Sequence, residues 1–340
     1  MAESRARWQV ESRPLTAWLL GAALAASSPV GAQDNKGEQA DDTLSAIVRV
    51  QAKILPDART RAILGAQREG SGVLIRDGFV LTIGYLTLEA DSIEVTGADG
   101  KAVPALLAGY DHASGFGVLK LLGPSPGKPL PLGDSGALRE RLPAMVATFD
   151  GRDGVNLVYV VSRRPFTGSW EYLLESAIYT YPPVANWSGA ALIGATGALL
   201  GIGSLIVPDA AAPGTPSAGN LFVPIDLLKP ILEDLITRGR AAGPARPWLG
   251  LNADEVRGRL MVVRVSPEGP AERAGVNPGD IVLGVAGEPV SSLADFYRKL
   301  WARGTAGTEV QLRVLQGAQV NELKLQSIDR TEYFRRKPVY

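Results

Sequence analysis

The chain has 340 residues, no cysteine and a formal net charge of zero, with 46% hydrophobic and 21% charged residues. This length and composition are typical of a globular protein with more than one domain, and they exclude a disordered chain. The absence of cysteine excludes disulfides, thiolate nucleophiles and Cys-ligated metals. The balanced charge and the lack of a basic stripe argue against a nucleic-acid partner. We expect no metal and no other cofactor.

The N-terminus has the pattern of an export signal. Basic residues precede a short apolar run over 15–26, and Val30-Gly-Ala32 offers small residues for cleavage. The run is shorter than the roughly 20 residues that a membrane span needs. We therefore expect a signal peptide over 1–32, cleaved after Ala32, and a mature protein without a membrane span; an uncleaved anchor is the alternative. Residues 33–43 are polar and predict a flexible leader.

Short apolar runs separated by turn residues follow over 44–239, and they predict a mostly β fold. Asp77-Gly78 and Asp99-Gly100 each separate two such runs, which is a hairpin signal. The runs fall into two similar batches, a pattern that indicates two six-stranded β-barrels. A helical pattern then begins at Leu227 and stops at Gly239, because glycine favours helix C-termini.

A second module follows the Gly-, Pro- and Arg-rich linker over 240–247. Its range is 248–329, and it combines strand patterns with a helix that begins after Ser292, where the serine side chain can cap the first turn. The sequence thus predicts an α+β domain. The last residues, 330–340, are basic and predict an exposed tail.

Several segments carry a family resemblance through their order and spacing. They are Gly70-Ser-Gly-Val-Leu-Ile75 with Leu81-Thr82, Gly109-Tyr-Asp-His-Ala-Ser-Gly-Phe-Gly-Val-Leu-Lys120, Leu132-Gly-Asp-Ser135, Ala185-Asn-Trp-Ser-Gly-Ala-Ala-Leu192 and Gly269-Pro-Ala-Glu-Arg-Ala-Gly-Val-Asn-Pro-Gly-Asp280. The chain resembles the bacterial serine proteases of the HtrA/Deg type, which are trypsin-like enzymes with a C-terminal PDZ domain. The resemblance implies two chymotrypsin-like six-stranded β-barrels, then a PDZ domain, and a periplasmic location.

The resemblance also implies where a catalytic triad would lie, and two of its three positions are replaced. The nucleophile position falls on Ser188, the histidine position on Tyr85 and the aspartate position on Gly115. A tyrosine, with a reference pKa of about 10, is a poor base at neutral pH, and glycine cannot orient a base. We therefore expect a catalytically degenerate member that is not an enzyme. The single histidine, His112, is expected on a surface loop.

The surroundings of Ser188 are also altered. Asn186 occupies the position of a glycine that the resemblance places in the oxyanion hole, where the turn favours glycine. Trp187 either plugs the substrate site or packs as an aromatic residue at a barrel edge. A Ser–Lys dyad would need a desolvated lysine near the serine, for which Lys101 and Lys120 are the candidates.

The PDZ-like module carries the expected peptide site. Pro247-Trp-Leu-Gly-Leu251 resembles the carboxylate-binding loop of PDZ domains, whose consecutive backbone N–H groups capture a peptide C-terminus. The residues of this site are Trp248, Leu249, Gly250 and Leu251. Phe296 and Leu300 lie on one apolar helix face and belong either to the peptide groove or to the core.

These features predict an exported pseudoprotease that binds protein C-termini or extended, unfolded peptides through its PDZ domain. Its role would be regulatory, that of a scaffold, or in protein quality control. The alternative is a serine endopeptidase with residual or unorthodox activity through Ser188. A third possibility is a chaperone-like scaffold that forms a homo-oligomer or a hetero-oligomer with an active relative.

Overall fold

The computed structural model describes residues 42–335, which fall within one compact unit. The predicted signal peptide, nearly all of the leader and the last five residues of the tail lie outside the described residues. Between residues 42 and 335, no helix is long and apolar enough to cross a membrane. The predicted fold class is confirmed: the chain is mostly β, with two closed barrels followed by an α+β domain.

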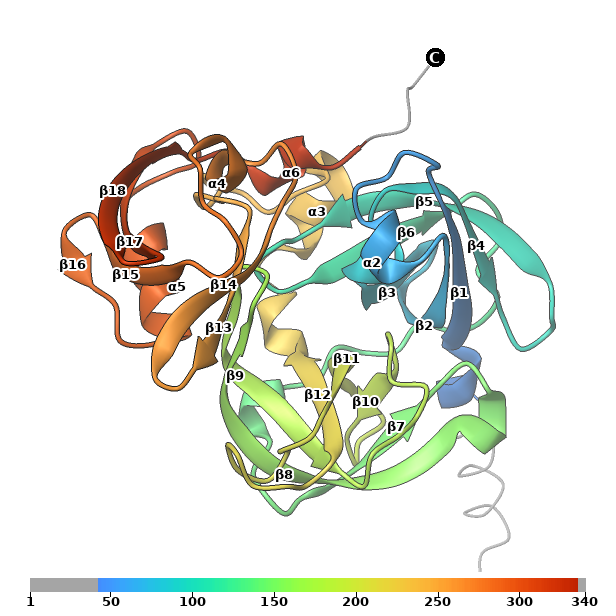
Figure 1. Ribbon diagram of the computed structural model, residues 1–340. Helices are drawn as coiled ribbons and strands as arrows, with labels where there is room; N and C mark the ends of the chain where they lie inside the picture. Colours follow the sequence, from blue (N-terminus) through green and yellow to red (C-terminus); the bar gives the residue numbers. More distant parts are fainter. Residues whose placement is uncertain (1–41, 336–340) are drawn as a thin grey trace, which may run out of the picture. The chain divides into compact units, whose positions relative to one another are not determined.

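The first barrel is closed in the strand order β1-β2-β3-β6-β5-β4 (Figure 1). Both predicted Asp-Gly turns join neighbouring strands, and Gly78 and Gly100 each adopt a φ of 74°, which glycine adopts with the least strain. The elements are β1 (Ile47–Ile54), α2 (Arg61–Leu64), β2 (Gln67–Arg76), β3 (Phe79–Ile83), η1 (Gly84–Leu86), β4 (Ala90–Thr96), β5 (Ala102–Tyr110) and β6 (Phe116–Leu121).

The second barrel is closed in the corresponding order β10-β11-β12-β9-β8-β7. Its strands are β7 (Pro143–Ala147), β8 (Val155–Gly168), β9 (Tyr172–Tyr181), β10 (Ala191–Ile193), β11 (Leu199–Val207) and β12 (Gly219–Pro224). Short 3₁₀ helices accompany them: η2 (Ser135–Ala137), η3 (Gly151–Gly154) and η4 (Ile225–Leu227).

The helix expected from Leu227 is shorter than its apolar pattern. Helix α3 spans Leu232–Arg238 and ends at Gly239, whose φ of 77° provides the predicted left-handed stop. Residues 225–227 form the separate 3₁₀ helix instead. Pro230 explains the break, because the residue before a proline is driven away from helical backbone angles.

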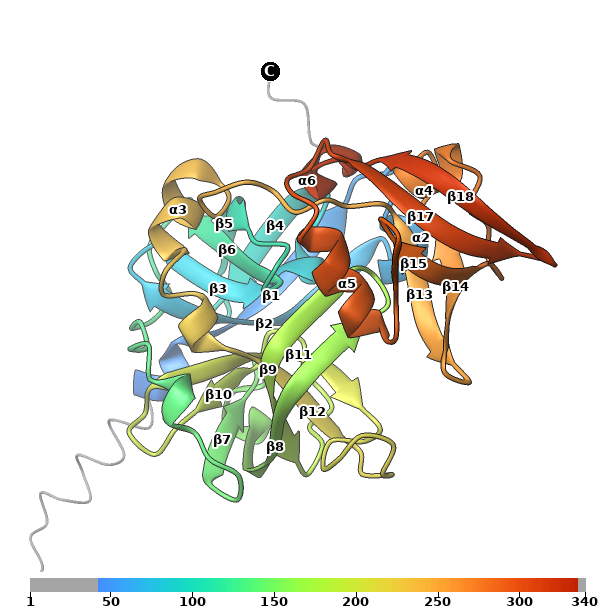
Figure 2. The ribbon, with the colours of Figure 1, turned by 90° about the vertical axis from the view of Figure 1, so that its left-hand side faces the viewer.

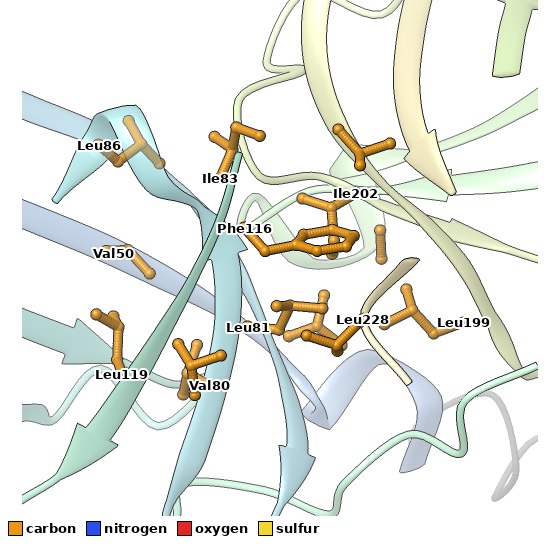
Figure 3. Packing of buried hydrophobic residues seen from close by; sticks show 14 of the residues in the cluster. Val50, Val80, Leu81, Ile83, Leu86, Phe116, Leu119, Leu199, Ile202 and Leu228 are labelled. Atoms are coloured by element: carbon orange, nitrogen blue, oxygen red, sulfur yellow. The ribbon is translucent and has the colours of Figure 1, made fainter. Parts of the chain in front are cut away.

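Apolar side chains from both barrels meet in one buried cluster. Leu81 and Phe116 of the first barrel face Ile202 and Leu199 of the second (Figure 3), and all four are fully buried. Burying apolar surface contributes about 25 cal/mol per Å², so such a cluster holds two barrels in a defined arrangement. This arrangement brings the end of β3 and the turn before β10, which carry the candidate catalytic residues, close together.

The C-terminal domain is a six-stranded sheet with helices. The elements are β13 (Leu251–Val256), β14 (Arg259–Val265), α4 (Pro270–Arg273), β15 (Ile281–Val285), β16 (Glu288–Pro289), α5 (Leu293–Trp301), β17 (Glu309–Gln316), β18 (Gln319–Gln326) and α6 (Arg330–Tyr333). The Ser292 hydroxyl accepts a hydrogen bond of 3.0 Å from the N–H of Asp295, so the predicted helix cap of α5 is confirmed.

The tail is more ordered than its composition predicts. Residues 330–333 form α6, and the Tyr333 ring packs on Trp248 with ring centroids 4.6 Å apart. Phe334 stacks on His112 at 5.7 Å. Residues 330–334 were expected to be exposed, and they are half-buried apart from the exposed Glu332, because two aromatic side chains pack this segment against the domains before it.

Candidate functional site

Ser188 and Tyr85 bring their hydroxyl groups together. The two oxygens lie 2.8 Å apart, and the Tyr85 oxygen also lies 2.8 Å from the carbonyl oxygen of Ser204. A carbonyl can only accept and a phenol has one proton, so the Tyr85 hydroxyl donates to Ser204. The Ser188 hydroxyl is then left to donate to the Tyr85 oxygen. Its proton thus points at Tyr85 in the way that a nucleophile's proton points at its base.

The Tyr85 hydroxyl is protonated at neutral pH. Burial raises the pKa of this phenol to about 12, while hydrogen bonds with the side chains of Ser188 and Trp187 oppose the rise. The same bond places the Trp187 indole beside the Tyr85 hydroxyl. Of the two interpretations of Trp187, this contact favours a side chain at the site over one at a distant barrel edge.

Glycines determine the turn that carries Ser188. Its carbonyl accepts a hydrogen bond of 2.7 Å from the N–H of Ser71, and a Cβ at Gly70 would lie 2.6 Å from the same carbonyl oxygen. Gly189 has a φ of 73°, and a Cβ there would lie 1.9 Å from the Ser71 carbonyl. Both positions therefore exclude larger residues, so the Gly-Ser-Gly strand and the serine turn fit together only as glycines.

Asn186 does not adopt the left-handed backbone conformation that favours glycine at its position. It does not adopt a positive φ, and its side-chain amide donates to Asp150 Oδ2 at 2.7 Å. The left-handed residue of the turn is Gly189 instead. No acceptor within residues 42–335 takes the backbone N–H of Asn186 or of Ser188. Both N–H groups therefore lack a partner among the described residues.

Gly115, at the aspartate position, has only backbone groups and no carboxylate. Its carbonyl accepts a 2.7 Å hydrogen bond from the N–H of Gly84, the residue before Tyr85, and its own φ is 81°. A Cβ at this position would lie 3.4 Å from the Tyr172 hydroxyl, which is ordinary contact. The residue therefore holds the chain near Tyr85 but offers no polar group to it. The Ser204 carbonyl is the group that orients the phenol.

The other titratable candidates lie elsewhere. Lys101 pairs with Asp99 at an exposed turn, and Lys120 is exposed on β6. In the described part of the chain, the Ser188 hydroxyl has Tyr85 as its only side-chain partner. His112 lies in the turn between β5 and β6, as expected of a loop residue, but it is half-buried: it packs edge-on against Tyr110 with ring centroids 4.5 Å apart, and burial lowers its pKa well below the usual value.

The predicted carboxylate-binding loop holds a carboxylate from the same chain. The backbone N–H groups of Leu249, Gly250 and Leu251 donate to Glu171 Oε1 at 3.2, 2.7 and 3.2 Å. Gly250 has a φ of 79°, which allows three successive amides to point at one group. Glu171 lies in the turn between β8 and β9, and sequence reasoning did not identify it.

The apolar candidates of the peptide site are all buried. Trp248, Leu249 and Leu251 are at most 6% exposed, and Phe296 and Leu300 are fully buried in the core of the C-terminal domain. That core also contains Leu173 from β9 of the second barrel. Phe296 and Leu300 are therefore core residues in this structure, in a cluster that also receives a side chain from outside the domain.

The comparisons with known proteins match the two modules separately. The family model of the trypsin-like peptidase domain matches residues 70–202, and that of the PDZ domain matches residues 247–326. A solved structure of the HtrA-type protease AlgW with decapeptide has a TM-score of 0.52 at 22% identity, covering 89% of this chain and 99% of that chain. This likeness concerns the fold.

The chain spans 57% to 66% of the length of three curated relatives that it matches. A probable periplasmic serine protease do/HhoA-like from Haemophilus influenzae is 29% identical over 274 residues, which are 75% of this chain and 57% of the relative. The periplasmic pH-dependent serine endoprotease DegQ of Escherichia coli is 28% identical over 302 residues, 80% of this chain and 61% of the relative. The serine endoprotease DegS of Escherichia coli is 27% identical, with 66% of each chain covered.

The names of these relatives overturn one expectation from the sequence. The replaced triad positions led us to expect a chain that is not an enzyme, yet the relatives are named as serine proteases and endoproteases. That expectation is wrong, and Tyr85 and Ser188 are therefore a candidate catalytic pair. The chain thus contains a match to a trypsin-like peptidase domain followed by a match to a PDZ domain, and the relatives to which it is similar are named as serine proteases of the Deg and HhoA-like kind.

Proposed function

We propose that the chain is an exported, periplasmic serine endopeptidase in which Ser188 is the nucleophile and Tyr85 takes the place of the imidazole base. The observation that carries this proposal is the 2.8 Å contact between the two hydroxyl oxygens, with the serine proton directed at the phenol. The relatives named as periplasmic serine proteases and the two unpaired N–H donors beside Ser188 support it.

The chemistry follows from the protonation of Tyr85. A neutral phenol oxygen accepts a hydrogen bond but takes no proton, so the reactive form is the phenolate. The phenolate removes the Ser188 proton, the serine oxygen attacks the peptide carbonyl, and the N–H groups of Asn186 and Ser188 stabilise the oxyanion. The Tyr85 hydroxyl then returns the proton to the leaving amine. Because the pKa of Tyr85 is about 12, we expect slow hydrolysis at neutral pH.

Labelling with a serine-reactive fluorophosphonate tests the nucleophile. We expect the full chain to be labelled in proportion to its concentration at pH 9, because the reagent requires only an activated serine. Ser188→Ala removes the nucleophile and should abolish labelling. Tyr85→Phe keeps the ring but removes its oxygen, and should reduce the labelling rate at least tenfold. An unlabelled wild-type chain, or labelling that Ser188→Ala leaves unchanged, contradicts the proposal.

The PDZ module supplies a second proposed function, the binding of protein C-termini or extended peptides. Three amides of the loop already hold one carboxylate, the group that ends every polypeptide. Binding of this kind selects substrates or partners by their C-terminus, in regulation or in protein quality control. Assembly as a homo-oligomer, or with an active relative, belongs to the same proposal.

A further inference from the structure

We infer that the β8–β9 turn is an internal ligand of the PDZ domain, in which the Glu171 carboxylate occupies the place of a partner's C-terminal carboxylate. The inference rests on the proposed peptide-binding function and adds a regulation to it: a partner binds only when residues 168–173 leave the groove. Both ribbon views show this hairpin reaching the C-terminal domain, beside β13 in Figure 1 and near α5 in Figure 2.

The carboxylate is held by every amide that a peptide end would use. Glu171 Oε1 accepts from Leu249, Gly250 and Leu251, and Oε2 accepts from Leu249 at 3.1 Å. The residue is only 5% exposed. Each backbone N–H has a single proton, so these bonds and those to an incoming carboxylate exclude one another. The loop cannot hold Glu171 and a partner's C-terminus at the same time.

The backbone of the turn also lies where a bound peptide strand would lie. The N–H of Ala253, on β13, donates to the Ser169 carbonyl at 3.2 Å, as an edge strand does to an added strand. On the other side, the Tyr297 hydroxyl of α5 lies 2.8 Å from the Gly168 carbonyl and accepts the N–H of Glu171 at 3.0 Å. The turn is therefore bound between the edge strand and the helix that form a PDZ groove.

The hairpin also places an apolar side chain, that of Leu173, in the PDZ domain, as a peptide ligand would. Leu173, which belongs to β9, is 6% exposed and joins the buried cluster of the C-terminal domain with Leu249, Leu251, Phe296 and Leu300. A C-terminal peptide presents a carboxylate and an apolar side chain to such a groove. The turn presents both, although they come from two different residues.

Glu171 has a left-handed backbone conformation. Its φ is 57°, a left-handed conformation that costs a residue with a side chain free energy, and the position does not carry glycine. Strained residues persist where the surrounding contacts determine them, and they are common at ligand clamps and switches. At Glu171 the left-handed angle is that of the last residue in a three-residue hairpin loop, which Gly168 and Tyr172 close by pairing, and a glycine at this position would adopt it with less strain.

Tethering makes the internal ligand an effective competitor. A ligand on the same chain acts at an effective concentration in the millimolar range for short linkers, roughly 10³ times a micromolar dissociation constant. The fraction of chains with an open groove sets the apparent affinity for an added peptide. The intact protein should accordingly bind free C-termini more weakly than its PDZ groove allows.

The experiment compares variants of the full chain in a fluorescence polarisation titration with a labelled peptide that ends in valine with a free carboxylate. Glu171→Ala should bind this peptide at least tenfold more tightly than the wild type. Glu171→Gly, which also removes the backbone strain, should do the same, so a folding defect in one variant is checked by the other. Glu140→Ala is the matched control, since Glu140 is an exposed glutamate that precedes β7 of the second barrel and lies outside the β8–β9 hairpin; it should bind as the wild type does.

A second measurement separates this inference from the proposed function. Hydrogen exchange of the amides at 249–251, without added peptide, should speed up in Glu171→Ala and stay unchanged in Glu140→Ala. If exchange is faster in Glu171→Ala but no variant binds the peptide, the internal ligand is supported and the peptide-binding function is contradicted. Equal peptide affinity and equal exchange in wild type and Glu171→Ala overturn the internal ligand. An amidated peptide should bind none of these variants tightly.

Docking of the turn should also depend on pH. Burial raises the pKa of the Glu171 carboxyl to about 7, although the hydrogen bonds from the loop amides and the positive charge of Arg330 in α6 act to lower it. The Tyr297 hydroxyl of α5 faces the same group. A raised pKa means that docking is strongest below about pH 4.5, the usual value, and weakens as pH rises to about 7. Docking is therefore strongest for the neutral carboxyl, and the peptide affinity of the wild type should rise about fiftyfold from pH 5 to pH 7.5, whereas that of Glu171→Ala should stay flat. Parallel profiles in the two proteins would contradict this coupling.

Discussion

Peptide hydrolysis by the full chain should increase about tenfold for each pH unit between pH 7 and pH 9. The reactive form is the Tyr85 phenolate, and the pKa of this group is about 12. Far below a pKa, each unit of pH raises the deprotonated fraction tenfold, so the rate follows with unit slope. A protease with an imidazole base would instead reach its plateau near neutral pH, since the reference pKa of histidine is about 6.5.

The fold should persist over this range. A phenol whose pKa is raised by burial stabilises the folded state below its unfolded pKa of about 10, and that contribution is lost only as pH rises towards about 12. The window from pH 7 to pH 9 lies below both values. A rising rate therefore reports the base and not a loosening of the barrel.

Matched variants identify the titrating group. Tyr85→Phe keeps the ring and removes the hydroxyl, so its rate should lie at background at every pH. Ser188→Ala should be inactive throughout. The measurement is initial rates on an unstructured fluorogenic peptide in buffers of constant ionic strength. A plateau below pH 8, or a Tyr85→Phe variant with the wild-type slope, would rule out Tyr85 as the base.

The sequence predicted those parts of the structure that depend on local pattern. Asp-Gly turns and alternating apolar runs gave both barrels, because hairpins are encoded by neighbouring residues. The pairing of Tyr85 with Ser188 came from a family resemblance, since 103 residues separate the two. Their mutual geometry, including the role of the Ser204 carbonyl, required the structure. No local pattern indicates which carbonyl a phenol will meet.

Contacts between domains were the features that the sequence did not predict. Glu171 binds amides 78 to 80 residues away, and nothing in the sequence of its short turn indicates that partner. Its positive φ is equally hidden, because glycine or asparagine would be expected at such a position. His112 does lie in a turn, but the sequence did not predict that Phe334 stacks on it and leaves it half-buried. When a segment distant in the sequence buries a residue, the local pattern of apolar and polar residues does not indicate it.

Replacing Tyr85 with histidine should raise the hydrolysis rate at pH 7 about a hundredfold, the lower end of what a positioned general base contributes. Burial lowers the pKa of an imidazole, so the ring would be neutral at pH 7 and free to take the Ser188 proton. The gain stays at the lower end because the aspartate position is Gly115, and a histidine without a carboxylate partner adopts unproductive tautomers and orientations. The Tyr85→His profile should also level off near neutral pH.

Adding the carboxylate should help less than the family pattern implies. Gly115 has a φ of 81°, so Gly115→Asp forces a side chain onto a left-handed backbone, and its Cβ would face the Tyr172 hydroxyl at 3.4 Å. We therefore expect Tyr85→His with Gly115→Asp to exceed Tyr85→His by less than tenfold. Tyr85→His with Ser188→Ala is the control that ties any gain to the nucleophile. If folded Tyr85→His hydrolyses peptides no faster than the wild type at pH 7, the base does not limit the reaction, and the Tyr85 phenol is not its replacement.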